Sequence, residues 1–185
     1  FEDLFGFAEV VGGADEWEAT RSHFIWDLHK GKLTSKANRR SFQAGRFSTP
    51  SLAELRTRVD LRNASSGAAL AGTLRVSQVV SDVSELHLDP ANAHALFQAA
   101  SQFNALEFVD ETVTPEDGIT RYQHDHTQGP ACATACAAGT VIRNYFSVDG
   151  RGQTSTQQLN NLERVEQLLD NAEQHYFRVK GGYTL

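Results

Sequence analysis

The chain has 185 residues, with 23 acidic and 17 basic side chains and a formal net charge of −6. That balance argues against a nucleic-acid-binding surface, which usually carries a basic excess, and no apolar run reaches the roughly 18 residues of a membrane-spanning helix. Apolar residues make up 40 %, enough for one ordinary domain, and two cysteines are too few for a disulfide framework. We therefore expect one domain in a reducing, cytoplasmic compartment, with no nucleic-acid or membrane partner.

The first part of the chain, residues 1–70, is predicted to form a helical and irregular extension that packs on the core. Residues 15–31 fit one helix, with acids in its first turn and Gly31 as its stop. Farther on, the stretch STPSLAEL indicates a helix start, because Glu54 follows Ser51 by three residues, which is the spacing of a capping box.

Residues 71–185 are predicted to form the core of the protein. Within them, the apolar segments 74–79 and 94–100 are predicted to be strands, and the second runs into polar residues at its end. Alternating strands and helices favour an α/β layered fold, in which ligands bind at the carboxyl ends of the strands. The polar end of LFQAASQFN is therefore where we expect a ligand to bind.

The second half of this core carries a long loop and two predicted helices. Residues 104–129 have a proline, an acidic cluster and little periodicity, and loops of this length tend to be functional or disordered. Small side chains favour a helix over 130–138, and the apolar stretch TVIRNYFSV is either its continuation or a strand. The clearest predicted helix is 154–176, because its leucines fall on one stripe; a short strand and a glycine turn follow it.

Polar side chains cluster where the predicted strand 94–100 ends, at Ser101, Gln102 and Asn104, with Glu107 close behind. Amide side chains both donate and accept hydrogen bonds, which suits the recognition of ribose hydroxyl groups or of an amide. The alternative is that these residues only cap the following turn through local hydrogen bonds.

The stretch TQGPACATACAAG indicates an anion-binding turn. Gly129 permits close approach to the backbone, and the helix that follows Pro130 presents unpaired N–H groups to an anion. Tight helix packing also selects alanine and glycine, so it is an alternative explanation. Asp125, just before this turn, is placed to orient a water molecule or bind a sugar hydroxyl, unless it serves only as a turn or N-cap residue.

A metal site is a further alternative for the same region. His124, His126, Cys132 and Cys136 are residue types that ligate zinc, and a Cys–His pair would also make a nucleophile. The two cysteines are four residues apart rather than in the C-x₂-C spacing of most structural zinc sites, and a cysteine among alanines is typical of a small buried residue. We therefore predict no metal ligands and no cofactor.

Taken together, the segments LFQAASQFNALE, TQGPA and RNYF resemble the macrodomain family, whose members bind ADP-ribose or hydrolyse ADP-ribosyl conjugates. More closely, the chain is similar to a divergent branch that includes bacterial effector hydrolases acting on ADP-ribosylated ubiquitin; LFGFAE and GRFSTPSLAELR also resemble that branch. The resemblance implies a macrodomain-like three-layer α/β/α fold with a mixed sheet. It also implies further strands and a second phosphate-binding loop beyond KGGYTL, so we expect a version of that fold truncated at the C-terminus.

The resemblance assigns roles residue by residue. Asn104 would contact the distal ribose, and Gln102 would line the same pocket. Asp125, in the pattern Asp-x-Thr-Gln-Gly-Pro, would lie beside the anomeric carbon, with Glu107 as a further catalytic carboxylate. Asp110 or its neighbour Glu111 would supply another from the long loop. The pyrophosphate would lie against the turn formed by Thr127, Gln128, Gly129, Pro130 and Ala131.

The chain departs from the usual family pattern at two points. Gln128 and Gly129 stand where many catalytic loops have two glycines, and Ser-Gln-Phe-Asn replaces Ala-Ala-Asn at the end of the strand. The second departure moves Asn104 along the chain relative to the strand.

These assignments predict an enzyme that removes ADP-ribose from modified protein side chains by attack of water at the ribose C1″. A nearby carboxylate would stabilise the oxocarbenium-like transition state. The alternatives are an ADP-ribose-binding module without turnover, a zinc-bearing interaction domain and a purely structural role. We expect a monomer whose partner is ADP-ribose or an ADP-ribosylated protein such as ubiquitin, in the cytoplasm or, for an effector, in a host cytoplasm.

Overall fold

The computed structural model describes residues 1–66, 73–147 and 151–185. The chain divides into two compact units, one formed by Phe1–Phe47 together with Asp82–Leu185 and the other by Ser48–Ser81. The larger unit holds the hydrophobic core and every residue to which the sequence assigns a role in ligand binding or catalysis.

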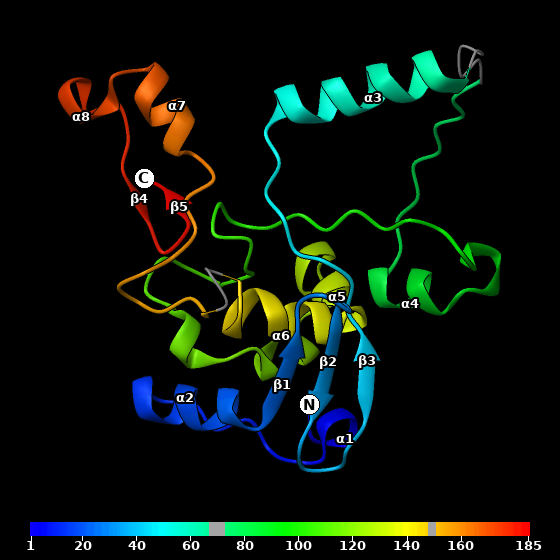
Figure 1. The fold of residues 1–185 in the computed structure, drawn as a ribbon, viewed down its shortest axis with the longest axis vertical. Coiled ribbons are helices and arrows are strands. Elements are labelled where there is room, and N and C mark those ends of the chain that lie inside the picture. Colours follow the sequence, from blue (N-terminus) through cyan, green and yellow to red (C-terminus); the bar gives the residue numbers. More distant parts are fainter. Residues whose placement is uncertain (67–72, 148–150) are drawn as a thin grey trace. The chain divides into compact units, whose positions relative to one another are not determined.

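The N-terminal part of the larger unit is a small antiparallel sheet with two helices (Figure 1). Its elements are α1 (Glu2–Phe5), α2 (Ala14–Ser22), β1 (Phe24–Asp27), β2 (Lys32–Ser35) and β3 (Ser41–Gln43), and the strands lie in the order β1-β2-β3. The helix predicted over 15–31 is therefore wrong beyond Ser22. Phe24 is buried while Ile25 is 53 % exposed, and this alternation favours a strand over a helix.

Aromatic side chains fill the core of the larger unit. Phe5 is completely buried and makes edge-to-face contacts with Phe24 and Phe42, with ring centroids 5.1 and 5.2 Å apart. The other buried residues of this core are Trp17, Leu33, Ile119, Tyr122, Ala133, Val141 and Tyr145. The core thus joins the N-terminal sheet to the helices that follow the long loop.

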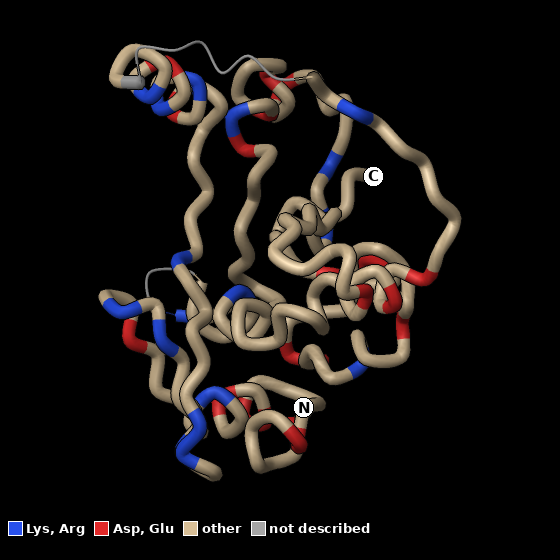
Figure 2. The backbone as a smooth tube through the Cα atoms, turned by 90° about the vertical axis from the view of Figure 1, so that its right-hand side faces the viewer, with Lys and Arg blue, Asp and Glu red and all other residues tan. Residues whose placement is uncertain are grey.

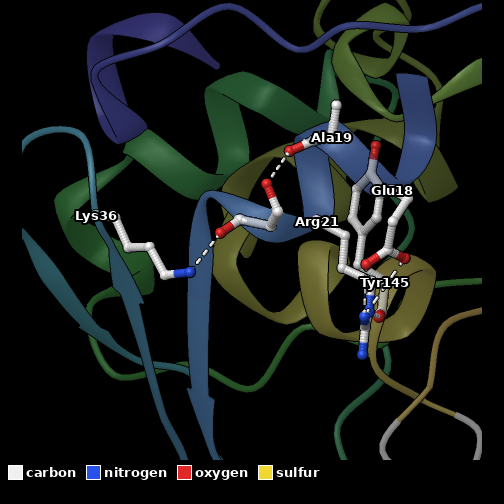
Figure 3. A network of polar contacts seen from close by, with 6 residues as sticks. Glu18, Ala19, Arg21, Lys36 and Tyr145 are labelled. Atoms are coloured by element: carbon white, nitrogen blue, oxygen red, sulfur yellow. Dashed lines mark hydrogen bonds and ion pairs between the residues drawn. The ribbon is translucent and has the colours of Figure 1, made fainter. Parts of the chain in front are cut away.

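Polar contacts tie α2 to the segment after β2 and to the end of helix α6 (Ala137–Tyr145), as Figure 3 shows. Lys36 Nζ donates to the carbonyl of Ser22 (2.6 Å), and Arg21 Nε donates to the carbonyl of Tyr145 (3.0 Å). Arg21 also pairs with Glu18 at 3.0 Å, a largely exposed ion pair of a kind that adds little to stability. Side chains thus satisfy backbone carbonyls at the ends of both helices.

The smaller unit holds α3 (Leu52–Ser66), and its predicted start is confirmed. Glu54 accepts hydrogen bonds from Ser51 N–H (2.6 Å) and Ser51 Oγ (2.7 Å), and Glu54 N–H donates to Ser51 Oγ (3.2 Å). Both basic and acidic residues lie along this helix (Figure 2). The strand predicted over 74–79 is wrong: the segment pairs with no other described segment, and Leu74 and Val76 are 86 % and 83 % exposed.

The next elements of the larger unit are α4 (Val83–Leu88) and the short 3-10 helix η1 (Pro90–Asn92). The strand predicted over 94–100 is also wrong: this segment pairs with no strand in the part of the chain that the structure describes, and Leu96 is 98 % exposed. A side chain holds its backbone instead. Ala100 N–H donates to Gln128 Oε1 (2.7 Å), and Gln128 Nε2 donates to the carbonyl of Gln98.

The predicted loop 104–129 contains two 3-10 helices, and two α-helices follow it. These elements are η2 (Pro115–Asp117), η3 (Thr120–His124), α5 (Gln128–Ala135) and α6. The helix predicted over 130–138 is thus largely confirmed. The residues TVIRNY do not form a strand, because they lie in the second helix, α6. Cys136, with φ −107° and ψ 45°, separates α5 from α6.

The single helix predicted over 154–176 is wrong, because the structure has α7 (Glu163–Leu168) and α8 (Asn171–Gln174) instead. Asp170 lies between them with φ 51°, a left-handed conformation that a helix interior does not accommodate. The last elements, β4 (Val179–Lys180) and β5 (Tyr183–Thr184), form an antiparallel hairpin. Gly181 and Gly182 make its turn with φ 57° and 82°, which confirms the predicted glycine turn.

The described residues thus form a mixed α/β fold with two small antiparallel sheets. The predicted α/β class is confirmed at this level, whereas the three-layer arrangement with a mixed sheet stays a prediction. The predicted division into 1–70 and 71–185 also stays a prediction. None of the helices in the described ranges is both long and apolar enough to cross a membrane.

Candidate functional site

The candidate site is centred on Glu107 and the first turn of α5. Gly129 lies in that turn, and a Cβ atom built on it would lie 2.4 Å from Glu107 Cδ and 2.5 and 2.6 Å from the two carboxyl oxygens. Real Cβ atoms essentially never approach other atoms so closely, so the carboxyl group rests directly on the glycine backbone. The group that approaches Gly129 closely in this structure is therefore a carboxyl group of the protein itself.

The surroundings of Glu107 favour its protonated form. Its pKa is raised from 4.5 to about 7, mainly by partial burial; the Arg143 guanidinium opposes this shift, and the Asp125 carboxylate adds to it. Glu107 Oε1 is shielded from solvent and has no hydrogen-bond partner among the described residues. A carboxyl group with a pKa near 7 can both donate and accept a proton at neutral pH.

The loop that carries Glu107 is clamped by side chains. Gln102 Nε2 donates to the carbonyl of Phe108 (3.0 Å), and Phe108 N–H donates to Gln102 Oε1 (3.1 Å). Tyr183 donates its hydroxyl hydrogen to the same carbonyl and accepts a hydrogen bond from Gln102 Nε2 (2.9 Å). Glu107 N–H donates to Tyr122 Oη (3.1 Å). Gln102, predicted to line the ligand pocket, thus uses both ends of its amide within the chain.

Asn104, predicted to contact the distal ribose, is completely buried. Its Nδ2 donates to Gln158 Oε1 (2.9 Å), and its Oδ1 accepts from Leu106 N–H (3.0 Å). A Cβ atom on Gly182 would lie 2.7 Å from Asn104 Cγ, so the turn of the hairpin packs directly on this amide. The Asn104 side chain therefore belongs to the internal hydrogen-bond network in this structure.

Asp125 and Thr127 form a local turn before α5. Asp125 Oδ1 accepts hydrogen bonds from Thr127 Oγ1 (2.5 Å) and Thr127 N–H (2.9 Å), and these bonds hold the pKa of Asp125 below its usual range. Asp125 is therefore ionised at neutral pH. It also lines a pocket of about 190 Å³, whose other walls include Tyr122, Ala131 and Thr134.

The first turn of α5 offers an anion fewer N–H groups than the sequence suggests. Pro130 has no amide hydrogen, and Ala131 N–H donates to the carbonyl of Thr127 (3.0 Å). The N–H groups of Gln128 and Gly129 are left at this end of the helix, where the helix itself provides no partners. The Glu107 carboxyl group lies against the Cα side of Gly129, where a Cβ atom would be.

Asp110, the third predicted catalytic carboxylate, lies on the surface. It accepts hydrogen bonds from Thr112 Oγ1 (2.5 Å) and Thr112 N–H (2.8 Å), which lower its pKa. This is the geometry of an aspartate that caps its own turn. The Asp125 charge thus makes a small contribution to the raised pKa of Glu107, whereas Asp110 is engaged in a turn of its own.

The residues considered as alternative zinc ligands do not share a common site, and two of them contact side chains elsewhere in the larger unit. His126 Nδ1 lies 3.2 Å from Asp82 Oδ2, whereas Cys132 Sγ lies 3.4 Å from His87 Nε2. Across the described ranges, no group of three or more His, Cys, Asp or Glu side chains is arranged to hold a metal ion. Burial raises the pKa of the Cys132 thiol, whereas nucleophilic cysteines have a lowered pKa.

Sequence reasoning missed three residues that shape the site. Arg143 donates to the carbonyl of Ala105 (3.1 Å), and its charge acts on Glu107. Tyr122 and Tyr183 hold the backbone on either side of that glutamate. Arg143 belongs to the RNYF segment that carries the family resemblance, so the sequence held a signal for it. The tyrosines are far apart in sequence, and only the tertiary structure links them to the site.

This arrangement suits acid–base chemistry. The pKa of Glu107 is raised, mainly by burial, and that of Asp125 is lowered by its hydrogen bonds from Thr127, so the two pKa values are displaced in opposite directions. Such a pair supplies a proton donor and an ionised carboxylate at the same pH. No family model, curated protein or solved structure matches the chain.

Proposed function

We propose that this chain is a hydrolase that removes ADP-ribose from the modified side chains of proteins such as ubiquitin, by attack of water at the ribose C1″. The observation that carries the proposal is the Glu107 carboxyl group, which rests on Gly129 at the start of α5 and has a pKa raised to about 7, with the ionised Asp125 just before the same helix. When a glycosidic bond is hydrolysed, one carboxyl group transfers a proton and an ionised one stabilises the oxocarbenium-like transition state. The proposal includes the macrodomain-like three-layer fold that the sequence resemblance implies.

Each carboxyl group would take the role that its surroundings favour. Asp125 is kept ionised by two hydrogen bonds from Thr127. Its negative charge would stabilise the positive charge that develops at C1″ in the transition state. Glu107 is partly protonated at neutral pH and would move a proton between the attacking water and the leaving group. Its unpartnered Oε1 would accept a hydrogen bond from that water.

The ligand would use the pocket beside Asp125 and the backbone of the first turn of α5. The pocket has about 190 Å³, which is smaller than the roughly 300–1,000 Å³ of sites that enclose a whole drug-sized ligand. It would therefore take one moiety of ADP-ribose, such as the distal ribose. The phosphates would bind the N–H groups of Gln128 and Gly129 at the start of α5, while the Glu107 carboxyl group keeps its place on Gly129.

A hydrolysis assay on the full chain tests the proposal. ADP-ribosylated ubiquitin, and peptides modified on serine, arginine or glutamate, are incubated with the protein, and free ADP-ribose is quantified by liquid chromatography. Glu107→Gln should release ADP-ribose at least about a hundredfold more slowly than the wild type, since an acid–base group is lost. Glu163→Gln, the same change at an exposed position of α7, is the matched control. No release from any substrate, or equal rates in the two variants, would refute the proposal.

The second candidate function is an ADP-ribose-binding module without turnover, and one observation favours it. Asp125 Oδ1 already accepts two hydrogen bonds from Thr127, as a turn-capping aspartate does. Isothermal titration with ADP-ribose, with AMP as the control ligand, separates the candidates when it is combined with the hydrolysis assay. A binding module would retain ADP-ribose more tightly than AMP and release none from the conjugates.

A further inference from the structure

The turn of the β4–β5 hairpin is docked on the loop that carries Glu107. The carbonyl of Gly182 accepts a hydrogen bond from Phe103 N–H (3.0 Å), and the carbonyl of Gly181 accepts a longer one from Asn104 Nδ2 (3.4 Å). Both glycines have positive φ, so the turn adopts a backbone shape that side chains at these positions would disfavour. The hairpin and the loop, about 75 residues apart in sequence, are thus packed together and joined by hydrogen bonds.

Tyr183, the first residue of β5, reaches from this hairpin to the residue that follows Glu107. Its hydroxyl donates to the carbonyl of Phe108 and accepts from Gln102 Nε2 (2.9 Å), and Gln102 binds both backbone groups of Phe108. Partial burial raises the pKa of Tyr183, so its hydroxyl keeps the hydrogen that it donates. Phe108 itself is 5 % exposed, so water does not compete freely for these backbone groups.

We propose that Tyr183 is a positioning residue for Glu107: by holding the Phe108 carbonyl, it fixes the backbone from which the Glu107 carboxyl group rests on Gly129. Tyr122 holds the other side of the same residue by accepting from Glu107 N–H. With both sides fixed, the Glu107 side chain starts from one defined backbone position. The effect of this positioning on catalysis rests on the proposed hydrolase function. In such a reaction, a displacement of a catalytic group by about 1 Å can lower the rate a hundredfold.

The test follows the ionisation of Glu107 in the full chain. The carboxyl carbon of Glu107 is titrated by ¹³C NMR and assigned from its absence in Glu107→Gln. Tyr183→Phe keeps the ring and removes the hydroxyl. We expect its Glu107 midpoint to lie below the wild-type value by at least about one pH unit, because a loosened loop lets water reach the carboxyl group. Tyr176→Phe, the same change at a tyrosine that is 65 % exposed, should leave the midpoint where it is.

Gln102→Met is the second variant, because it removes both hydrogen bonds between the Gln102 side-chain amide and the Phe108 backbone and keeps the length of the side chain. Thermal denaturation identifies which variants fold like the wild type. An unchanged Glu107 midpoint in a folded Tyr183→Phe or Gln102→Met protein would overturn the positioning role.

Turnover is a separate readout of the same variants. Tyr183→Phe should lower kcat about tenfold with KM nearly unchanged, the pattern of a lost transition-state interaction. A wild-type protein without turnover would refute the proposed hydrolase function, and the NMR titration would still decide the positioning role. The two failures are therefore distinguishable.

Discussion

The carboxyl group of Glu107 occupies the space in which a side chain at position 129 would begin. This relation explains why a glycine occupies position 129 in the first turn of α5, and it places the Glu107 carboxyl group against the backbone of another element. Asp125 and Arg143 act on the same carboxyl group with opposite effects on its pKa. The site therefore depends on a contact between two segments more than on any single motif.

Gly129→Ala should displace Glu107 while the fold is kept. The new Cβ would meet the far end of a flexible side chain, which can swing aside, so we expect the free energy of unfolding to change by less than about 1 kcal/mol. The pKa of Glu107 should fall toward its usual range as the carboxyl group becomes exposed, and ¹³C NMR titration measures it.

Gly139→Ala is the matched control for this substitution. The atom nearest to its new Cβ is Cys136 Sγ at 3.9 Å, and Gly139 lies within α6, so the change should stabilise the protein by about 0.5–1 kcal/mol. An unchanged Glu107 titration in Gly129→Ala would contradict the contact between the carboxyl group and the helix backbone.

Glu107 should make the stability of the protein depend on pH. Its pKa is raised from 4.5 to about 7 in the folded state, so the folded protein holds this proton more tightly than the unfolded chain. The stabilisation is fully present below about pH 4.5 and is lost as the pH rises through 7. For a half-buried group we expect about 1–2 kcal/mol after solvent screening is allowed for.

Glu107→Gln mimics the protonated side chain, so the variant does not lose stability through ionisation at this position as the pH rises. The variant should therefore be more stable than the wild type at pH 8 by about 1–2 kcal/mol, and nearly equal to it near pH 4.5. Urea denaturation at the two pH values measures both differences. Equal stability at pH 8 would mean that burial does not penalise the charged form of Glu107.

Asp125→Ala should separate binding from turnover. The substitution removes the ionised carboxylate and leaves the N–H groups at the start of α5, so ADP-ribose affinity should stay within about tenfold while turnover falls at least about a hundredfold. Isothermal titration and the hydrolysis assay give the two numbers. Turnover at the wild-type rate would remove Asp125 from catalysis and assign it to the turn that it forms with Thr127.

Asn104→Ala should destabilise the protein by about 2–4 kcal/mol, because it leaves the buried Leu106 N–H without its acceptor and opens a cavity. Asn161→Ala is the control: Asn161 is exposed and donates one hydrogen bond to the carbonyl of Phe103, so it should cost less than about 1 kcal/mol. Chemical denaturation of both variants gives the comparison. Similar losses would show that the Asn104 amide is not part of the internal network.

Features that a few neighbouring residues decide were predictable from the sequence. The capping box of Ser51 and Glu54 and the glycine turn at Gly181 and Gly182 are both present, because each depends on local backbone geometry. The strands expected over 74–79 and 94–100 are absent, because a strand depends on a partner elsewhere in the chain. Apolar composition alone does not supply that partner.

At the candidate site, residue type predicted which segments carry the polar groups but not what these groups contact. Gly129 was predicted to allow close approach to its backbone, but that the approaching group is Glu107 is a tertiary fact. Gln102 and Asn104 were assigned to a ribose because amides both donate and accept hydrogen bonds. A peptide group or another amide satisfies the same side chain equally well, and in this structure their partners come from the protein.

The pH dependence of ADP-ribose release, measured for the wild type and Glu107→Gln, is the most direct test of the proposed chemistry. We predict that kcat/KM of the wild type changes near pH 7, where Glu107 titrates. The same change should be missing from Glu107→Gln, whose rate should be at least about a hundredfold lower. A change near pH 7 that persists in the variant, or a wild type that releases no ADP-ribose from any conjugate, would contradict the role of Glu107 in hydrolysis.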